Sequence, residues 1–151
     1  MKISKRINDI IEELKDQYLE EDRCNRPWII GFSGGKDSTV LLTLTWLALQ
    51  QLKEKGHRLT RQVFVVCNDT MVENPVIEEH VTVVLDTIRK AAKEQEMPIT
   101  VATTTPELED TFWCCVIGKG YPAPNNSFRF CTEKMKIKPT SKFITDQVVA
   151  D

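Results

Sequence analysis

A chain of 151 residues is long enough for one domain with a buried core of ordinary size. Its 41% hydrophobic and 28% charged residues are typical of a soluble globular protein, and its net charge of −2 argues neither for nor against a nucleic-acid partner. No apolar run has the length of a transmembrane helix, so we expect no membrane partner.

Cysteine usage indicates a reducing compartment. The chain has an odd number of cysteines without the spacing of a disulfide scaffold, and its charged N-terminus lacks the apolar stretch of a signal peptide. The cysteines are Cys24, Cys67, Cys114, Cys115 and Cys131. We therefore expect a cytoplasmic protein.

The first predicted elements are an N-terminal helix and a core strand. Residues 3–19 predict an amphipathic helix, because apolar side chains recur there at helical spacing: Ile3, Ile7, Ile10, Ile11, Leu14 and Tyr18. Residues 28–32 form a continuous apolar run, which is typical of a strand covered on both faces.

Helices and strands then alternate along the chain. We expect helices over 38–55 and 76–96, a strand over 62–67 between them, and a further strand over 99–103. This order predicts an α/β fold, with a Rossmann-like parallel sheet, right-handed connections and helices on both faces.

The last third of the chain has a different pattern. Residues 107–117 predict another helix, 118–127 a loop and 141–149 a final helix. The stretch from 128 to 142 is basic, with several cations against the single carboxylate of Glu133: Arg129, Lys134, Lys136, Lys138 and Lys142. Such a bias suits a phosphate-bearing ligand, and on charge alone it suits a solvated basic face equally well.

A glycine-rich turn between the first strand and the following helix predicts a phosphate cradle. The turn consists of Ser33, Gly34, Gly35, Lys36, Asp37, Ser38 and Thr39. Gly34 and Gly35 can adopt positive φ, and free N–H groups at the helix start would face an anion. A Walker A loop is excluded, because only three residues separate Gly31 from Gly35 and because Asp37 follows Lys36.

Two groups of polar side chains would complete a nucleotide site. Asp37 makes chemical sense beside phosphates if Mg²⁺ stands between them, or if it orients the loop, while Lys36 would neutralise phosphate or face solvent. A second cluster follows the strand at 62–67 and lies at the same sheet edge: Asn68, Asp69, Thr70 and Glu73. Its members would reach ribose, base or metal, or would cap the helix that begins near Pro75.

Cys131 is the candidate for sulfur chemistry. Its neighbours Arg129, Lys134 and Lys136 would favour the thiolate, although a buried structural cysteine is the alternative. The remaining cysteines of the predicted elements are better explained by packing: Cys67, Cys114 and Cys115.

Four motifs together resemble one protein family. They are Ser-Gly-Gly-Lys-Asp-Ser-Thr at 33–39, Asn-Asp-Thr-x-Val-Glu at 68–73, Phe-Trp-Cys-Cys-Val-Ile-Gly-Lys-Gly-Tyr-Pro-Ala-Pro at 112–124 and Arg-Phe-Cys-Thr-x-x-Met-Lys-Ile-x-Pro at 129–139. The first is similar to the PP-loop of the ATP pyrophosphatases. The set resembles the phosphoadenosine-phosphosulfate-reductase-like branch of that superfamily, and within it the DndC-type DNA phosphorothioation sulfurtransferases.

The resemblance implies a single PP-loop domain over 1–151 with an adenine nucleotide alpha hydrolase-like fold. Residues 1–26 would be its N-terminal helix and 106–151 its sulfur- and phosphate-handling segment. Because family members are usually much longer, the chain would be the N-terminal portion of a longer protein. The resemblance also implies ATP, Mg²⁺, DNA, a cysteine desulfurase as sulfur donor, and other subunits of a phosphorothioation complex. A 4Fe–4S cluster in the full-length protein, with Cys131 as one ligand, is implied as well.

These expectations combine into a mechanism. ATP would bind in the loop, a DNA phosphate oxygen would attack the α-phosphate, and sulfur on Cys131 would then displace AMP while basic side chains hold phosphate: Arg129, Lys136 and Lys138. Three alternatives share the loop. They are a reductase of adenylyl sulfates, an ATP pyrophosphatase that activates a carbonyl on tRNA or a small molecule, and a non-catalytic ATP-binding subunit.

Overall fold

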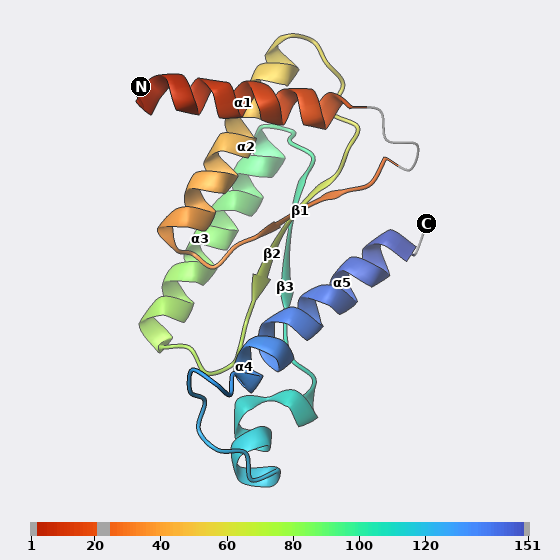
Figure 1. Ribbon diagram of the computed structural model, residues 1–151. Helices are drawn as coiled ribbons and strands as arrows, with labels where there is room; N and C mark the ends of the chain where they lie inside the picture. The colour runs from red at the N-terminus through yellow and green to blue at the C-terminus, as the bar shows by residue number, and fades with distance from the viewer. Residues whose placement is uncertain (1–2, 21–24, 150–151) are drawn as a thin grey trace.

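A three-stranded parallel sheet organises the protein (Figure 1). The computed structural model describes residues 3–20 and 25–149. The alternating elements are α1 (Ile3–Leu19), β1 (Trp28–Gly31), α2 (Lys36–Glu54), β2 (Val63–Asn68), α3 (Pro75–Glu94) and β3 (Ile99–Thr104). Strand order in the sheet is β1-β2-β3, with Trp28 opposite Val63 and Val63 opposite Ile99. The predicted α/β fold with a parallel sheet is confirmed, and the strand boundaries differ from the prediction by a single residue.

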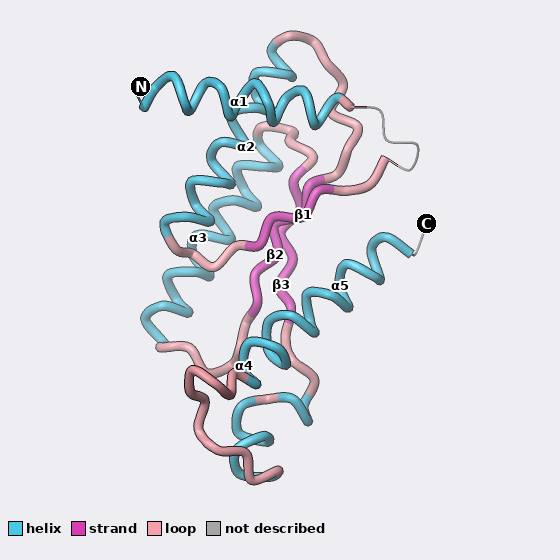
Figure 2. The backbone as a smooth tube through the Cα atoms, in the orientation of Figure 1, coloured by secondary structure: helices cyan, strands magenta, loops and turns pink. Residues whose placement is uncertain are grey.

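Helices cover both faces of the sheet, as the continuous apolar strands predict. Side chains of β2 alternate, so Val63, Val65 and Cys67 enter the core with residues of α2 and α3. Phe64 points to the opposite face, where its ring contacts Phe143 of α5 (Lys138–Val149) at a centroid distance of 5.4 Å. Figure 2 shows α2 and α3 on one side of the strands and α5 on the other.

The N-terminal helix is less buried than its pattern predicts. Helix α1 packs on α2, and only Ile11, Lys15 and Tyr18 are buried. The predicted helix bounds are confirmed, but much of its apolar face is open to solvent, since Ile3 and Ile10 are 78% and 44% exposed. Buried Lys15 is compensated because its ammonium donates to Glu12 and to Gln51 of α2, at 2.5 and 3.1 Å.

The predicted helix over 107–117 is also wrong. A 3₁₀ turn spans Leu108–Asp110, Thr111 is extended with ψ of 154°, and a π-helical turn follows at Cys114–Gly118. The predicted final helix, in contrast, begins earlier than residue 141. Helical structure runs through α4 (Phe130–Thr132), a π-turn (Glu133–Ile137) and α5. Pro139 is tolerated in the first turn of α5, where a missing N–H costs little.

No helix within the described residues is both long and apolar enough to cross a membrane.

Candidate functional site

A cavity of about 350 Å³ opens at the carboxyl ends of the strands. Its wall combines the end of β1, the end of β2, the first turns of α3, Thr103 of β3 and one side chain of the π-turn at 133–137. The polar lining residues are Ser33, Cys67, Asn68, Asp69, Glu73, Glu78, Thr82, Thr103 and Lys136. The cavity therefore joins four segments that are far apart in sequence.

The glycine-rich loop forms one rim of this cavity, and Gly34 requires its lack of a side chain. Gly34 has φ of +73°, and a Cβ at this position would lie 2.7 Å from Cγ2 of Val81 in α3. Gly35 differs from the expectation of positive φ. It is extended, with φ of −80°, and it is the N-cap residue of α2, which therefore begins at Lys36 rather than near Ser38.

The start of α2 is open to an anion. Gly35 provides no side-chain cap, so the N–H groups of the first helical turn have no capping acceptor. The loop hydroxyls bond within the loop: Ser38 and Thr39 donate to the Gly35 carbonyl at 3.0 and 2.8 Å, and the Ser33 and Ser38 hydroxyl oxygens lie 3.3 Å apart. These bonds hold the backbone in its cradle shape.

Lys36 and Asp37 lie in the first turn of α2, where both are exposed. Neither side chain forms a hydrogen bond or an ion pair with another described residue, and neither lines the cavity. Asp37 thus keeps both carboxylate oxygens available at the helix start.

The predicted polar cluster after β2 lies at the cavity, and it divides into different roles. Asp69 accepts from the N–H of Met71 at 2.8 Å, and the Thr70 hydroxyl donates to Glu73 at 2.9 Å. Helix capping falls to Asn74, whose side chain accepts from Val76 N–H at 3.0 Å. Asp69 and Glu73 consequently remain lining groups of the cavity, while Thr70 is buried beside them.

Asn68 connects the sheet to the C-terminal segment. Its Oδ1 accepts from the hydroxyl of Thr104 at 2.6 Å and from that of Thr140 in α5 at 2.8 Å. The side chain lies on the α5 face of β2, because it alternates with Cys67 on the α3 face.

The predicted basic residues separate in space. Lys136 lines the cavity, and it is the only cation among the described lining residues. Lys138 pairs instead with Asp110, and the Arg129 guanidinium donates to the Asn126 side chain at 3.3 Å.

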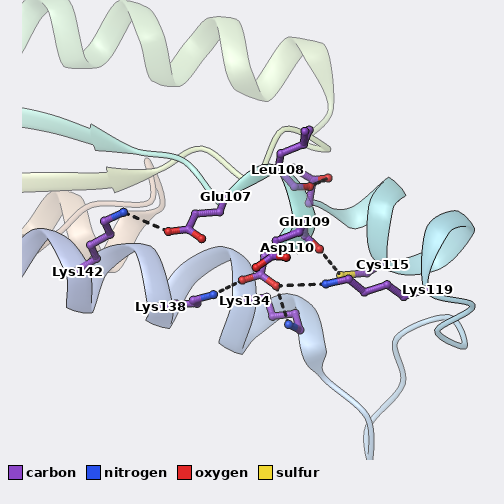
Figure 3. Close-up of polar contacts among 10 residues, drawn as sticks. Glu107, Leu108, Glu109, Asp110, Cys115, Lys119, Lys134, Lys138 and Lys142 are labelled. Atoms are coloured by element: carbon purple, nitrogen blue, oxygen red, sulfur yellow. Dashed lines mark hydrogen bonds and ion pairs between the residues drawn. The ribbon is translucent and has the colours of Figure 1, made fainter.

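Asp110 is a buried carboxylate surrounded by lysines (Figure 3). It is 2% exposed, its Oδ1 lies 2.6 Å from Lys134 Nζ and 3.9 Å from Lys119 Nζ, and its Oδ2 accepts from Lys138. The hydrogen bonds from Lys134 and Lys138 lower the pKa of Asp110 to about 2, and the same bonds raise the pKa of both lysines.

The thiol that lines the cavity belongs to Cys67. Burial raises its pKa, Asp69 and Glu73 raise it further, and Lys136 opposes them. Cys131 is half-buried in α4, where it packs against the cluster of Cys115, Phe130 and Met135, and it is not among the lining residues.

The described residues contain no group of side chains arranged as the ligands of an iron–sulfur cluster. No group of three or more His, Cys, Asp or Glu side chains there is placed to hold a metal ion. Buried Cys115 points its thiol at the Glu109 carbonyl, with an S···O distance of 3.8 Å.

Two site features escaped the sequence analysis. Cys67 enters the core, as predicted, but its position next to the carboxyl end of β2 also brings it to the cavity. Asp110 was not singled out, because nothing in a carboxylate's sequence context indicates burial. The spacing of Lys134 and Lys138, four residues apart on one helical face, was the available signal.

A similar protein is known from Methanocaldococcus jannaschii. The chain is 32% identical over 138 residues to its uncharacterized protein MJ0066, and the alignment covers 91% of this chain but 23% of that protein. The chain thus spans less than a quarter of the length of this relative, whose name assigns no activity. No protein-family model matches the chain.

Proposed function

We propose that this chain is a PP-loop ATP pyrophosphatase domain that activates a DNA backbone phosphate for sulfur insertion. The observation that carries the ATP-binding part is the shared cavity. It joins the glycine-rich loop at Ser33, the polar segment at Asn68–Glu73 and the cation of Lys136. The DNA acceptor comes from the resemblance to DndC-type sulfurtransferases.

The shape and charge of the site support a nucleotide. A volume of about 350 Å³ lies within the range of small-molecule pockets, and the uncapped helix start offers N–H donors beside it. Three carboxylates line the cavity with one lysine: Asp69, Glu73 and Glu78 with Lys136. Because this balance disfavours bare polyphosphate, ATP would enter as its Mg²⁺ complex. Asp37 is the residue that would hold the ion, which neutralises phosphate charge when bound.

In the first step, a non-bridging oxygen of a DNA phosphodiester attacks the α-phosphorus of ATP. The bond from this phosphorus to its bridging oxygen breaks, and pyrophosphate leaves with the electron pair. The N–H groups at the start of α2 and the Lys136 ammonium stabilise the departing charge. The product is a mixed anhydride of AMP and the DNA phosphate, in which AMP replaces a very poor oxide leaving group.

In the second step, the terminal sulfur of a persulfide on Cys131 attacks the DNA phosphorus and AMP leaves. A cysteine desulfurase supplies that sulfur. A thiol of an external reductant then attacks Cys131 Sγ, which releases the DNA phosphorothioate and leaves a mixed disulfide. A second thiol reduces this disulfide and restores Cys131.

The experiment combines the protein with Mg²⁺, α-labelled ATP, DNA, cysteine, a cysteine desulfurase and a small thiol. We expect labelled AMP and pyrophosphate by chromatography, and phosphorothioate-linked dinucleotides by mass spectrometry of the nuclease-digested DNA. ATP cleavage without phosphorothioate would contradict the DNA acceptor. ATP binding without cleavage would instead identify a nucleotide-binding subunit. Sulfite release in a parallel reaction, in which an adenylyl sulfate replaces ATP and DNA, would identify a reductase.

A further inference from the structure

Lys136, the cation that lines the cavity, lies on the π-turn at Glu133–Ile137, and the opposite face of this segment is held by ion pairs. Lys134 and Lys138 are four residues apart and meet the two oxygens of Asp110. Lys136 lies between them in sequence but lines the cavity. Two residues along a helix correspond to roughly half a turn, so the face that carries Lys136 is turned away from the face that carries Lys134 and Lys138.

Asp110 is placed to form ion pairs within the protein rather than to bind a ligand. Its carboxylate is 2% exposed and belongs to the 3₁₀ turn that follows β3, so it is anchored to the sheet rather than to the helical segment. Figure 3 shows the lysines approaching it from the π-turn and from the start of α5. A buried carboxylate needs such partners, because an unpaired charge in this position would be strongly destabilising.

A second bond holds the same segment at a neighbouring point. Thr140 donates to Asn68 at 2.8 Å, which links α5 to the end of β2. The π-turn at Glu133–Ile137 is therefore fixed from two strand ends, β3 through Asp110 and β2 through Asn68. Lys136 itself has no hydrogen-bond or ion-pair partner among the described residues, so its ammonium is available to a ligand.

We propose that Asp110 is a positioning residue that presents Lys136 to the nucleotide phosphates by holding Lys134 and Lys138 on the opposite side of the π-turn. The inference rests on the proposed function, since it assigns phosphate as the ligand of Lys136. It also reassigns Lys138 and Lys134, because their ammonium groups are engaged by Asp110.

The test measures MgATP affinity by calorimetry for Asp110→Asn, Lys136→Gln and the double variant. Each single change is expected to weaken binding by about tenfold, because Lys136→Gln removes the charge-assisted contact with the phosphates and Asp110→Asn misplaces the ammonium that makes it. The double variant should bind no more weakly than Lys136→Gln, since Asp110 acts only through Lys136. A further loss in the double variant, or wild-type affinity in Asp110→Asn, would overturn the proposal.

A second variant removes the ion pairs of Asp110 from the lysine side, in case Asp110→Asn does not fold. Lys134→Gln combined with Lys138→Gln should weaken MgATP binding to the same extent as Asp110→Asn. The matched control is Lys142→Gln, which breaks the exposed pair with Glu107 (3.1 Å) on the same segment and should leave affinity unchanged. Equal affinity of the control and the double lysine variant would contradict the proposal that these two ion pairs position Lys136.

Amide hydrogen exchange separates this proposal from the proposed function. In Asp110→Asn without nucleotide, residues 133–137 should exchange faster while β2 and α3 keep their protection. Unchanged protection of 133–137 would refute the proposal that Asp110 holds this π-turn, independently of which ligand the cavity binds. Absence of MgATP binding by the wild-type protein would refute the nucleotide site instead, and the exchange data would still report on Asp110.

Discussion

Gly34 shows how a single residue sets the shape of the loop. Its positive φ and the 2.7 Å approach of Val81 to the position of a Cβ act together, so any side chain would strain the backbone and push the loop from α3. Since α3 contributes much of the cavity wall, this close packing also brings the loop to the site.

We expect Gly34→Ala to destabilise the protein by about 1–3 kcal/mol, because the left-handed conformation and the clash with Val81 both oppose a methyl group. MgATP affinity should fall as well. Urea denaturation and calorimetry measure the two effects. Gly118→Ala is the control, because no atom lies within 4 Å of a Cβ there, and a stability change as large as that of Gly34→Ala would contradict this explanation.

Cys131 and Cys67 are the two candidate thiols, and substituting each by serine compares their roles. We expect Cys131→Ser to abolish phosphorothioate formation and to leave MgATP binding intact, because Cys131 does not line the cavity. Cys67→Ser should retain phosphorothioate formation, because the raised pKa of Cys67 disfavours the reactive thiolate. Mass spectrometry of the digested DNA decides between them. Loss in Cys67→Ser with retention in Cys131→Ser would transfer the sulfur role to Cys67.

At the scale of elements, long side chains attach helices that have little apolar contact with the sheet. Helix α1 ends beside Arg61, which is 8% exposed and lies before β2. The guanidinium donates to the Glu20 carbonyl at 2.7 Å, and the Tyr18 hydroxyl donates to the Arg61 carbonyl at 2.6 Å. A cation at the C-terminus of α1 also complements the helix dipole.

Arg61→Ala should therefore release the end of α1 and lower the free energy of unfolding by about 2–3 kcal/mol, since buried hydrogen bonds from a charged donor are lost. Chemical denaturation measures the change. Arg58→Ala removes a nearby exposed arginine and should change stability by less than about 0.5 kcal/mol. Equal losses of stability for the two substitutions would contradict a role of the Arg61 side chain in holding the end of α1.

At the scale of the whole molecule, the C-terminal segment is joined to the sheet through charge as well as through packing. Phe143 contacts Phe64, and Asp110 pairs with lysines on the far side of the site. The cluster of Cys115, Phe130 and Met135 forms a second small core beyond the strand ends. The stability of this part of the molecule should therefore depend on pH more than that of the main core.

The pH dependence follows from Asp110. Its pKa in the folded protein is about 2, below the ordinary value of 3.8, so its stabilising contribution is complete above about pH 5 and is lost as the pH falls through 3.8 and then through 2. Discounted for the exposure of the lysine partners, this contribution is about 1 kcal/mol. Denaturation at pH 5 and pH 2.5 should show a smaller loss for Asp110→Asn than for the wild type. Equal acid losses would contradict this linkage.

The alternation of elements and the local chemistry of the site were predictable from the sequence. Hydrophobic periodicity and β-branched runs located α2, β2, α3 and β3, because both faces of the sheet are covered and local pattern agrees with burial there. The glycine-rich loop and the polar segment after β2 were predicted to share a sheet edge, since the carboxyl ends of parallel strands lie together.

Which side chains of the basic segment reach the cavity is set by tertiary contacts. Lys134, Lys136 and Lys138 are equivalent in sequence, but the π-turn and buried Asp110 direct one of them to the cavity and two away from it. Likewise, the apolar face of α1 is only partly buried, because α1 packs mainly on α2 and reaches the sheet through Tyr18, whose ring contacts Trp28 of β1. Burial of a carboxylate and the direction of a side chain depend on contacts between distant segments, which periodicity does not encode.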